Sequence, residues 1–317
     1  MAKNILVLMS VEERHKRILE GKAPSCHFVY ADRKHLTAEM VRGAHIIIGN
    51  PPIPMVKGSE NLEWLQLNSA GVGEYTGKGV LRDRVVLTNA SGAYGLAISE
   101  YMLGVLLELY KKLYVYRDNQ MISKWQYEGQ VKAIYNSIAL IVGLGDIGGE
   151  FAKRLKALGA YTIGIRRTNT DKPDYLDELH FTEDLEGLLP RADIVALSLP
   201  ETKLTNKVIN KETLAMMKQD AVLINVGRGS VIDTDDLCDA LESGRLLGAA
   251  MDVTDPEPLP PEHRLWKIKN AVITPHVSGG YSLEETRSRI IRICADNLEA
   301  FLSGKRLKNV VDFAAGY

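Results

Sequence analysis

Residues 137–168, SIALIVGLGDIGGEFAKRLKALGAYTIGIRRT, decide the fold of this chain. The apolar run from Ile138 to Val142 is short enough for a buried parallel strand, and Gly143 to Gly148 follow it as G-x-G-x-x-G. Apolar residues at helical spacing come next, and Tyr161 to Ile165 reads as a second strand. Strand, glycine turn, helix and strand in this order predict a dinucleotide-binding unit ahead of an ordinary glycine-rich turn.

Each glycine of the motif has its own physical reason. Gly143 permits the tight turn out of the strand, and Gly145 lets a pyrophosphate approach the backbone. Gly148 allows the helix to pack closely on the sheet. The start of the helix then offers free N–H groups and the positive end of its dipole to the phosphates.

The residue that follows the second strand predicts which dinucleotide is bound. An NAD-binding unit places Asp or Glu there to hold the ribose 2′-hydroxyl, about 20 residues beyond the glycines. This chain instead has Arg166, followed by Arg167 and Thr168. Guanidinium groups bind a 2′-phosphate that a carboxylate would repel, so we expect NADP(H) in preference to NAD(H). The alternative is that these arginines are merely solvated.

Composition bounds the remaining possibilities. The 317 residues predict about two domains, and 45% hydrophobic with 25% charged residues is ordinary for a globular protein. The net charge of −1 argues against nucleic acid or an anionic membrane as a partner, and no apolar run is long enough to span a bilayer. The histidine and cysteine spacings suggest no metal site. The three cysteines, Cys26, Cys238 and Cys294, are typical of reduced thiols in a cytoplasmic protein.

The alternation of short apolar runs and helical segments predicts an α/β protein with two doubly wound parallel sheets. Residues 1–100 and 284–317 would form a flavodoxin-like substrate domain, and 101–283 an inserted Rossmann dinucleotide-binding domain. We expect the tail from Lys305 to Tyr317 to pack on the first domain, and the active site to lie between the two. A capping box at Ser282 to Glu285 predicts where the helix before that tail begins.

The helix expected over 96–113 has a wide apolar face, with Ile98, Met102, Leu106 and Leu109 at helical spacing. We interpret it as the interface of a homodimer; packing within the subunit is the alternative.

Loops that follow predicted strands in both domains contain candidate functional residues. In the first domain, Asn68 to Gly73 is a small-residue loop whose N–H groups suit a carboxylate, although an ordinary glycine loop is equally consistent. In the second domain three segments each follow a strand: NVGRGSVID at 225–233, DVTDPEP at 252–258 and TPHVSGG at 274–280. An arginine, a glutamate and a histidine at neighbouring strand ends of a dinucleotide domain favour a reaction centre.

With these motifs in this order, the whole chain resembles the D-isomer-specific 2-hydroxy-acid dehydrogenases. The resemblance implies that Arg228 binds the substrate carboxylate and polarises the 2-keto oxygen, and that His276 is the acid–base residue. Glu257 would hydrogen-bond His276 and favour its imidazolium form. Asp252 would hold the nicotinamide carboxamide. The N–H groups of the loop at Ala70, Gly71 and Val72 would bind the carboxylate, so that the substrate contacts are Ala70, Gly71, Val72, Arg228 and His276.

The resemblance also implies a larger set of cofactor contacts, spread over the glycine turn, the arginine segment and the loops after later strands. They are Gly143, Leu144, Gly145, Asp146, Ile147, Arg166, Arg167, Thr168, Leu199, Pro200, Thr205, Val226, Gly227, Asp252, Ser278 and Gly279.

The function that we expect is an NADPH-dependent reductase of small 2-keto acids, of the glyoxylate or hydroxypyruvate kind. The family members that oxidise formate have Gln where this chain has Glu257, which argues against formate. A phosphoglycerate-type dehydrogenase is an alternative, for which Lys57, Lys78 and Arg82 could supply cations. A dinucleotide-sensing protein of the co-repressor kind is another, and a methyltransferase a third. The sequence leaves the keto acid and the physiological direction open.

Overall fold

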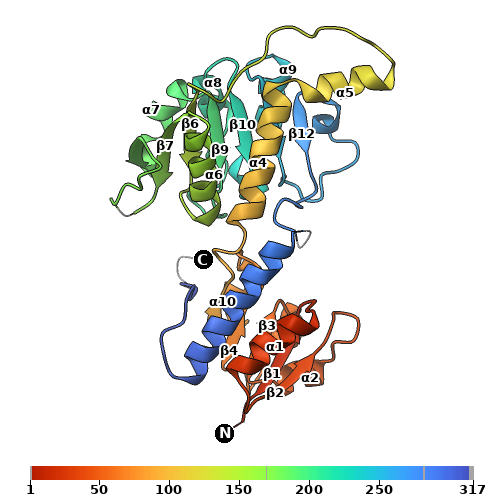
Figure 1. Ribbon diagram of the computed structural model, residues 1–317, viewed down its shortest axis with the longest axis vertical. Coiled ribbons are helices and arrows are strands. Elements are labelled where there is room, and N and C mark those ends of the chain that lie inside the picture. Colours follow the sequence, from red (N-terminus) through yellow and green to blue (C-terminus); the bar gives the residue numbers. More distant parts are fainter. Residues whose placement is uncertain (1, 169, 281–282, 314–317) are drawn as a thin grey trace. The chain divides into compact units, whose positions relative to one another are not determined.

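The computed structural model describes residues 2–168, 170–280 and 283–313 (Figure 1). The chain forms two compact units, of which unit 1 comprises residues 1–94 and 281–317 and unit 2 comprises residues 95–280. Our sequence boundaries lay at 100/101 and 283/284, a few residues further along. Both units are α/β structures built on parallel sheets, as the sequence predicted.

Unit 1 has a five-stranded parallel sheet in the order β2-β1-β3-β4-β5. This flavodoxin-like order reverses direction between β1 and β3, which is where open sheets of this kind bind ligands. The strands are short and largely buried, which explains their continuous apolar sequences. They comprise β1 (Asn4–Leu8), β2 (His27–Tyr30), β3 (Ile46–Gly49), β4 (Trp64–Gln66) and β5 (Val86–Thr88).

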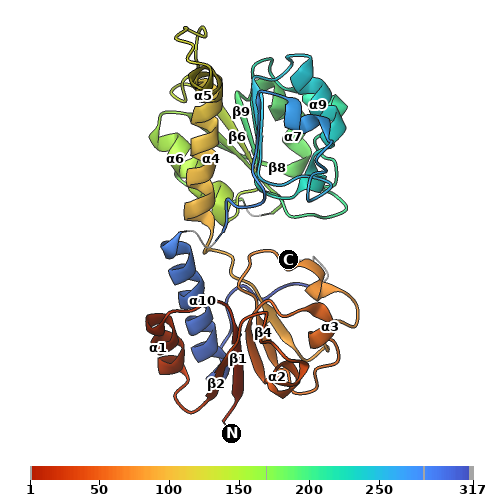
Figure 2. The same ribbon diagram turned by 90° about the vertical axis from the view of Figure 1, so that its right-hand side faces the viewer.

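Helices cover both faces of this sheet (Figure 2). The helices α1 (Glu13–Lys22) and α10 (Glu284–Leu302) lie on one face, and α2 (Ala38–Gly43) and α3 (Ile53–Val56) on the other. The described part of the tail packs on unit 1 as predicted, because Val311 N donates to Leu87 O at 2.9 Å beside the edge strand β5. Ser282 of the expected capping box lies outside the described residues, and α10 begins after Leu283 without a side-chain cap.

Unit 2 has a seven-stranded parallel sheet in the order β12-β11-β10-β9-β6-β7-β8. Its direction reverses between β6 and β9, at the strand that carries the glycine turn. The strands comprise β6 (Ile138–Val142), β7 (Tyr161–Arg166), β8 (Glu178–Phe181), β9 (Ile194–Leu197), β10 (Val222–Asn225), β11 (Gly248–Met251) and β12 (Ala271–Ile273).

The helices of unit 2 also lie on both faces of the sheet (Figure 2). One face carries α4 (Gly95–Tyr110) and α6 (Asp146–Ala157), and α5 (Leu113–Met121) follows α4 and extends away from the sheet. The other carries α7 (Leu185–Leu188), α8 (Lys211–Met216) and α9 (Thr234–Glu242). Among the described residues, no helix has both the length and the apolar character needed to cross a bilayer.

The apolar face of α4 is used inside unit 2. Ile98, Met102, Leu106 and Leu109 are buried in the single chain, where α4 packs on α6, β10 and β11. The face that we had assigned to a subunit interface therefore has the alternative role, internal packing. The homodimer itself stays a prediction.

Candidate active site

The three segments that carry Arg228, Glu257 and His276 lie side by side at one edge of the unit 2 sheet. Strand register aligns Asn225 of β10 with Met251 of β11, and Met251 with Ile273 of β12. Because the strands are parallel and in register, the loops that follow them leave the sheet together. This is the carboxyl edge, where open α/β sheets bind ligands.

The turn that carries Arg228 is fixed by a buried side chain. Asn225 is fully buried; its amide donates to Arg228 O at 2.8 Å, and its oxygen accepts from Gly227 N at 3.0 Å. A Cβ on Gly227 would lie 2.5 Å from Leu199 O, and one on Gly229 would lie 2.0 Å from the Thr254 carbonyl. The backbone of this turn therefore packs directly against the neighbouring loops. Arg228 is partly exposed, and its guanidinium donates to Gly227 O at 2.6 Å.

His276 and Glu257 form a hydrogen-bonded pair. The distance from His276 Nδ1 to Glu257 Oε1 is 2.7 Å, and the two side chains are 48% and 44% exposed. His276 has a left-handed backbone, with φ of 52°, and its N–H donates to Asp252 O at 2.8 Å. Within the described residues, His276 Nε2 has no hydrogen-bond partner. A histidine held at Nδ1 with Nε2 free is suited to general acid–base chemistry.

Asp252 anchors the turn that carries His276. Its side chain is 1% exposed, and it accepts hydrogen bonds from Thr274 Oγ1 at 2.6 Å and from Val277 N at 2.9 Å. Ser278 donates to it through both N–H and hydroxyl. Both carboxylate oxygens are thus engaged by the 274–278 segment. Contact between Asp252 and a nicotinamide stays a prediction.

Tyr101 of α4 also belongs to this network. Its hydroxyl lies 2.7 Å from Thr274 Oγ1, which in turn donates to Asp252. Burial raises the pKa of Tyr101 to about 12, so the hydroxyl stays protonated at neutral pH. The sequence did not reveal this link, because it does not show which side chain the Tyr101 hydroxyl faces.

The glycine turn has the geometry that a dinucleotide requires. Gly143 has φ of 101°, a conformation that favours glycine. A Cβ on Gly148 would lie 1.9 Å from Gly143 O, whereas a Cβ on Gly145 would meet nothing within 4 Å. No side chain caps α6. Exposed backbone beside an uncapped helix start fits a pyrophosphate.

Asp146, which we expected to contact the cofactor, has a structural partner. Its carboxylate accepts from Gly95 N at 2.6 Å, so it ties the start of α6 to the start of α4. Any Cβ on Gly95 would lie 2.5 Å from Asp146 Oδ1, which explains the glycine at that position. The sequence analysis did not find this link. Leu144 and Ile147 lie in the same turn and are partly exposed.

Arg166 ends β7 beside the glycine turn. Register pairs Val142 of β6 with Ile165 of β7, and Gly143 N donates to Ile165 O at 3.0 Å. Arg166 Nε is buried and has no hydrogen-bond partner in the part of the chain that the structure describes. Arg167 and Thr168 follow it on the surface. An unsatisfied guanidinium nitrogen at this position fits an anionic group on the ribose.

The remaining cofactor candidates lie in loops at the same edge. Thr205 Oγ1 donates to Pro200 O at 2.7 Å and closes the loop that begins at Leu199. Val226 is buried and its N–H donates to Leu197 O at 3.1 Å. Gly279 is partly exposed next to Ser278.

In unit 1, the loop after β4 presents free N–H groups. Asn89 Nδ2 donates to Ala70 O at 2.9 Å and Ser69 Oγ to Gly71 O at 2.7 Å, so the carbonyls of the loop are held. The N–H groups of Ala70, Gly71 and Val72 form no hydrogen bond with any described residue. The arrangement suits a carboxylate.

Comparison with known proteins gives a consistent result. Residues 103–278 match the NAD-binding domain of the D-isomer specific 2-hydroxyacid dehydrogenases. The chain is 33% identical over 258 residues to a glyoxylate reductase of Thermofilum pendens, an alignment that covers 79% of this chain and 75% of that protein.

Solved structures are similar over nearly the whole chain. A D-isomer specific 2-hydroxyacid dehydrogenase family protein of Aeromonas salmonicida has a TM-score of 0.88 at 30% identity, covering 99% of this chain and 100% of that one. An NADPH-dependent glyoxylate/hydroxypyruvate reductase of Sinorhizobium meliloti, in complex with NADP and sulfate, has a TM-score of 0.83 at 25% identity, with the same coverage. The chain therefore belongs to the D-isomer-specific 2-hydroxyacid dehydrogenase family and is an NAD(P)-dependent oxidoreductase.

Proposed function

We propose that this protein is an NADPH-dependent reductase of small 2-keto acids, of the glyoxylate or hydroxypyruvate kind. The observation that carries the proposal is the 2.7 Å hydrogen bond between His276 Nδ1 and Glu257 Oε1, with His276 Nε2 free. The relatives named as glyoxylate or hydroxypyruvate reductases support the substrate class.

Each residue of the candidate site has a separate role in this reaction. When bound, the dinucleotide supplies the hydride. Arg228 binds the substrate carboxylate and stabilises the negative charge that develops on the 2-keto oxygen. His276 donates the proton from Nε2 to that oxygen, and Glu257 orients the ring through its contact with Nδ1. In unit 1, the N–H groups of residues 70–72 bind the carboxylate.

Catalysis is tested by measuring NADPH and NADH oxidation with glyoxylate, hydroxypyruvate, pyruvate, phenylpyruvate and 2-ketopantoate. We expect turnover with glyoxylate or hydroxypyruvate, and a fall in kcat of about 10² to 10⁴ in His276→Ala. His27→Ala, which removes an exposed histidine of unit 1, serves as the matched control and should retain activity. Negligible turnover throughout the panel, with dinucleotide binding retained, would favour a sensing role. Near-normal kcat in His276→Ala would exclude its role as the acid.

The cofactor preference rests on Arg166. Its unpartnered buried Nε beside the glycine turn supports binding of the 2′-phosphate of NADPH. A hydrogen bond to a charged group contributes about 1.5–3 kcal/mol, so Arg166→Gln should lower kcat/KM for NADPH about 10- to 150-fold. The value for NADH should change little. Arg154→Gln, which removes a guanidinium that is ion-paired with Glu150 of α6, is the control. Equal losses with both dinucleotides would contradict the preference.

We also propose a homodimer, through a surface other than α4. The segment from α5 to residue 135 exposes several large apolar side chains and extends away from the unit 2 sheet (Figure 1, yellow). A second copy of the chain would cover them, since exposed apolar surface is typical of protein–protein interfaces. The exposed residues are Leu113, Met121, Ile122, Trp125, Tyr127, Val131 and Tyr135.

A further inference from the structure

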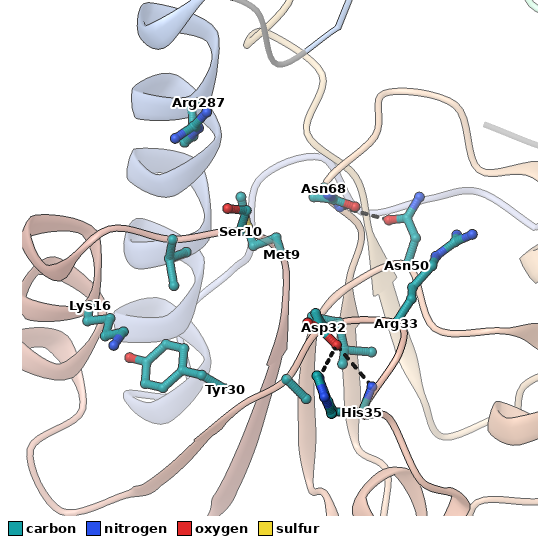
Figure 3. A pocket seen from close by; sticks show the side chains of 13 residues that line it. Met9, Ser10, Lys16, Tyr30, Asp32, Arg33, His35, Asn50, Asn68 and Arg287 are labelled. Carbon is teal, nitrogen blue, oxygen red and sulfur yellow. Dashed lines mark hydrogen bonds and ion pairs between the residues drawn. The ribbon is translucent and has the colours of Figure 1, made fainter.

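Unit 1 contains a large cavity, lined by both polar and apolar side chains, that the proposed chemistry does not use. Its volume is about 800 Å³, and it lies at the carboxyl ends of β1, β2 and β3, beside the point where the strand order reverses (Figure 3). Ligands of open α/β sheets bind at such positions. The volume is in the range of pockets that hold drug-sized molecules, and far exceeds what glyoxylate would fill. Its lining includes Leu8, Ser10, Arg33, Asn50, Asn68 and Arg287.

Most of the charged groups around this cavity are neutralised by neighbours. Lys16 Nζ lies 3.4 Å from Glu13, and Arg287 Nη1 lies 3.1 Å from Glu12. Asp32 is the one acidic residue that lines the cavity, and its Oδ1 contacts the His35 ring at 2.8 Å and accepts from the N–H groups of residues 34 and 35.

Arg33 is the exception. It is exposed, and none of the carboxylates among the described residues lies within ion-pairing distance of its guanidinium. Figure 3 shows its side chain directed toward Asn50 rather than toward Asp32. An uncompensated guanidinium at the wall of a cavity is suited to bind an anion.

Asn50 joins the Arg33 side of the cavity to the loop at residues 70–72. Its oxygen accepts from Asn68 N at 3.0 Å, and its amide donates to Ser69 Oγ at 2.9 Å. Ser69 Oγ then donates to Gly71 O at 2.7 Å. The cavity and the loop with the free N–H groups are therefore neighbours within unit 1.

Tyr75 ties the loop at residues 70–72 to the turn that follows β3. Tyr75 follows the same loop, and its hydroxyl donates to Pro51 O at 2.5 Å, next to Asn50. Burial raises the pKa of Tyr75 to about 12, and the positive charge of Arg33 acts on it in the opposite direction.

We propose that Arg33 binds a second anionic group of the substrate, distal to the carboxylate that lies on the 70–72 loop. The preferred substrates would then be 2-keto acids that carry another carboxylate or a phosphate at the far end. This inference rests on the proposed reductase function and specifies its substrate class. Asn50 and Asn68 would line the path between the two anionic groups.

The test compares pairs of keto acids that differ by the second anion: pyruvate with oxaloacetate, and hydroxypyruvate with its phosphate ester. We expect kcat/KM to be at least tenfold higher for one doubly charged member than for its partner, mainly through KM. That ratio should fall at least tenfold in Arg33→Gln. It should stay within twofold in Lys34→Gln, which removes an adjacent exposed charge that does not line the cavity. The pair with the larger ratio identifies the group, carboxylate or phosphate.

A binding measurement separates failure of this inference from failure of the reductase proposal. The cofactor-free full chain is titrated calorimetrically with hydroxypyruvate phosphate and with inorganic phosphate. Binding that weakens at least tenfold in Arg33→Gln, without turnover of any keto acid, would retain the anion site and reject the reductase. Turnover of glyoxylate with ratios and binding that are the same in wild type and Arg33→Gln would overturn the role of Arg33 and retain the reductase.

Discussion

Replacing Gly148 by alanine should destabilise unit 2 and disrupt the dinucleotide site together. The added Cβ would lie 1.9 Å from Gly143 O, and contacts below 3.0 Å essentially never occur, so the two backbones must separate by about 1.1 Å (3.0 − 1.9). Both groups are backbone, so no side chain can rotate away. Overpacking of this kind costs about 1–3 kcal/mol.

The net effect includes an opposing term, because Gly148 lies inside α6. Alanine is better than glycine in a helix by about 1 kcal/mol. Taking the upper end of the overpacking range, since the clash involves backbone only, we expect a net loss of about 2 kcal/mol in the free energy of unfolding. Urea unfolding followed by circular dichroism measures it.

Two other glycines provide controls. A Cβ on Gly145 meets nothing within 4 Å and its φ is −78°, so Gly145→Ala should keep wild-type stability and yet lose at least tenfold in NADPH affinity, measured by nicotinamide fluorescence. Gly104→Ala, on the exposed side of α4, should gain up to about 1 kcal/mol and bind NADPH normally. Wild-type stability in Gly148→Ala would refute the packing argument. Unchanged NADPH affinity in Gly145→Ala would refute the placement of the pyrophosphate.

Three further perturbations test other parts of the molecule. Hydrogen bonds from Arg191 are the main cause that lowers the pKa of Glu178 to about 2. The ionised Glu178 therefore stabilises the folded protein above about pH 4.5, and this contribution to the free energy of unfolding disappears as the pH falls toward 2. Wild type should therefore exceed Glu178→Gln by about 1 kcal/mol at pH 7, after allowance for solvent screening, and urea titrations should show the gap closing below pH 4.5. Asp252→Asn places an amide opposite the Ser278 N–H, so it should lower the free energy of unfolding by about 1–3 kcal/mol and also lower kcat. Asp255→Asn, at an exposed position, should change neither quantity. Equal unfolding midpoints for the two variants would contradict this. Trp125→Ser should shift the protein toward monomer in sedimentation velocity, and an undiminished dimer would exclude the 113–135 surface.

The sequence predicted most of the fold because the buried parallel strands are short apolar runs. The boundaries expected for β6 are the observed ones, 138–142. The strand β8, Glu178–Phe181, was not predicted from the sequence. Its residues, ELHF, are partly polar and half-buried, and it lies at the edge of the sheet. Such an edge strand has neither a continuous apolar run nor a clear alternation.

The candidate site was predictable where a motif supplies both partners. The hydrogen bond between Glu257 and His276, expected from the resemblance, is present. Links that depend on which helix faces meet could not be predicted, as for Tyr101 with Thr274. The orientation of the Arg33 side chain could not be predicted either. In the sequence, Arg33 belongs to the charged run DRKH, which resembles any solvated loop.

The division of unit 1 between two distant parts of the chain has a consequence for how the protein is made. The five strands of its sheet are complete by residue 88, but α10, whose Phe301 stacks on the buried Trp64 at 5.2 Å, begins only at residue 284. At about 5–20 residues per second, a ribosome needs roughly 10–40 s to synthesise the intervening stretch. During that interval one apolar face of the nascent sheet has α1 but lacks α10, the longer of its two covering helices. Chaperone binding should therefore concentrate on ribosome-bound chains that end between these two points.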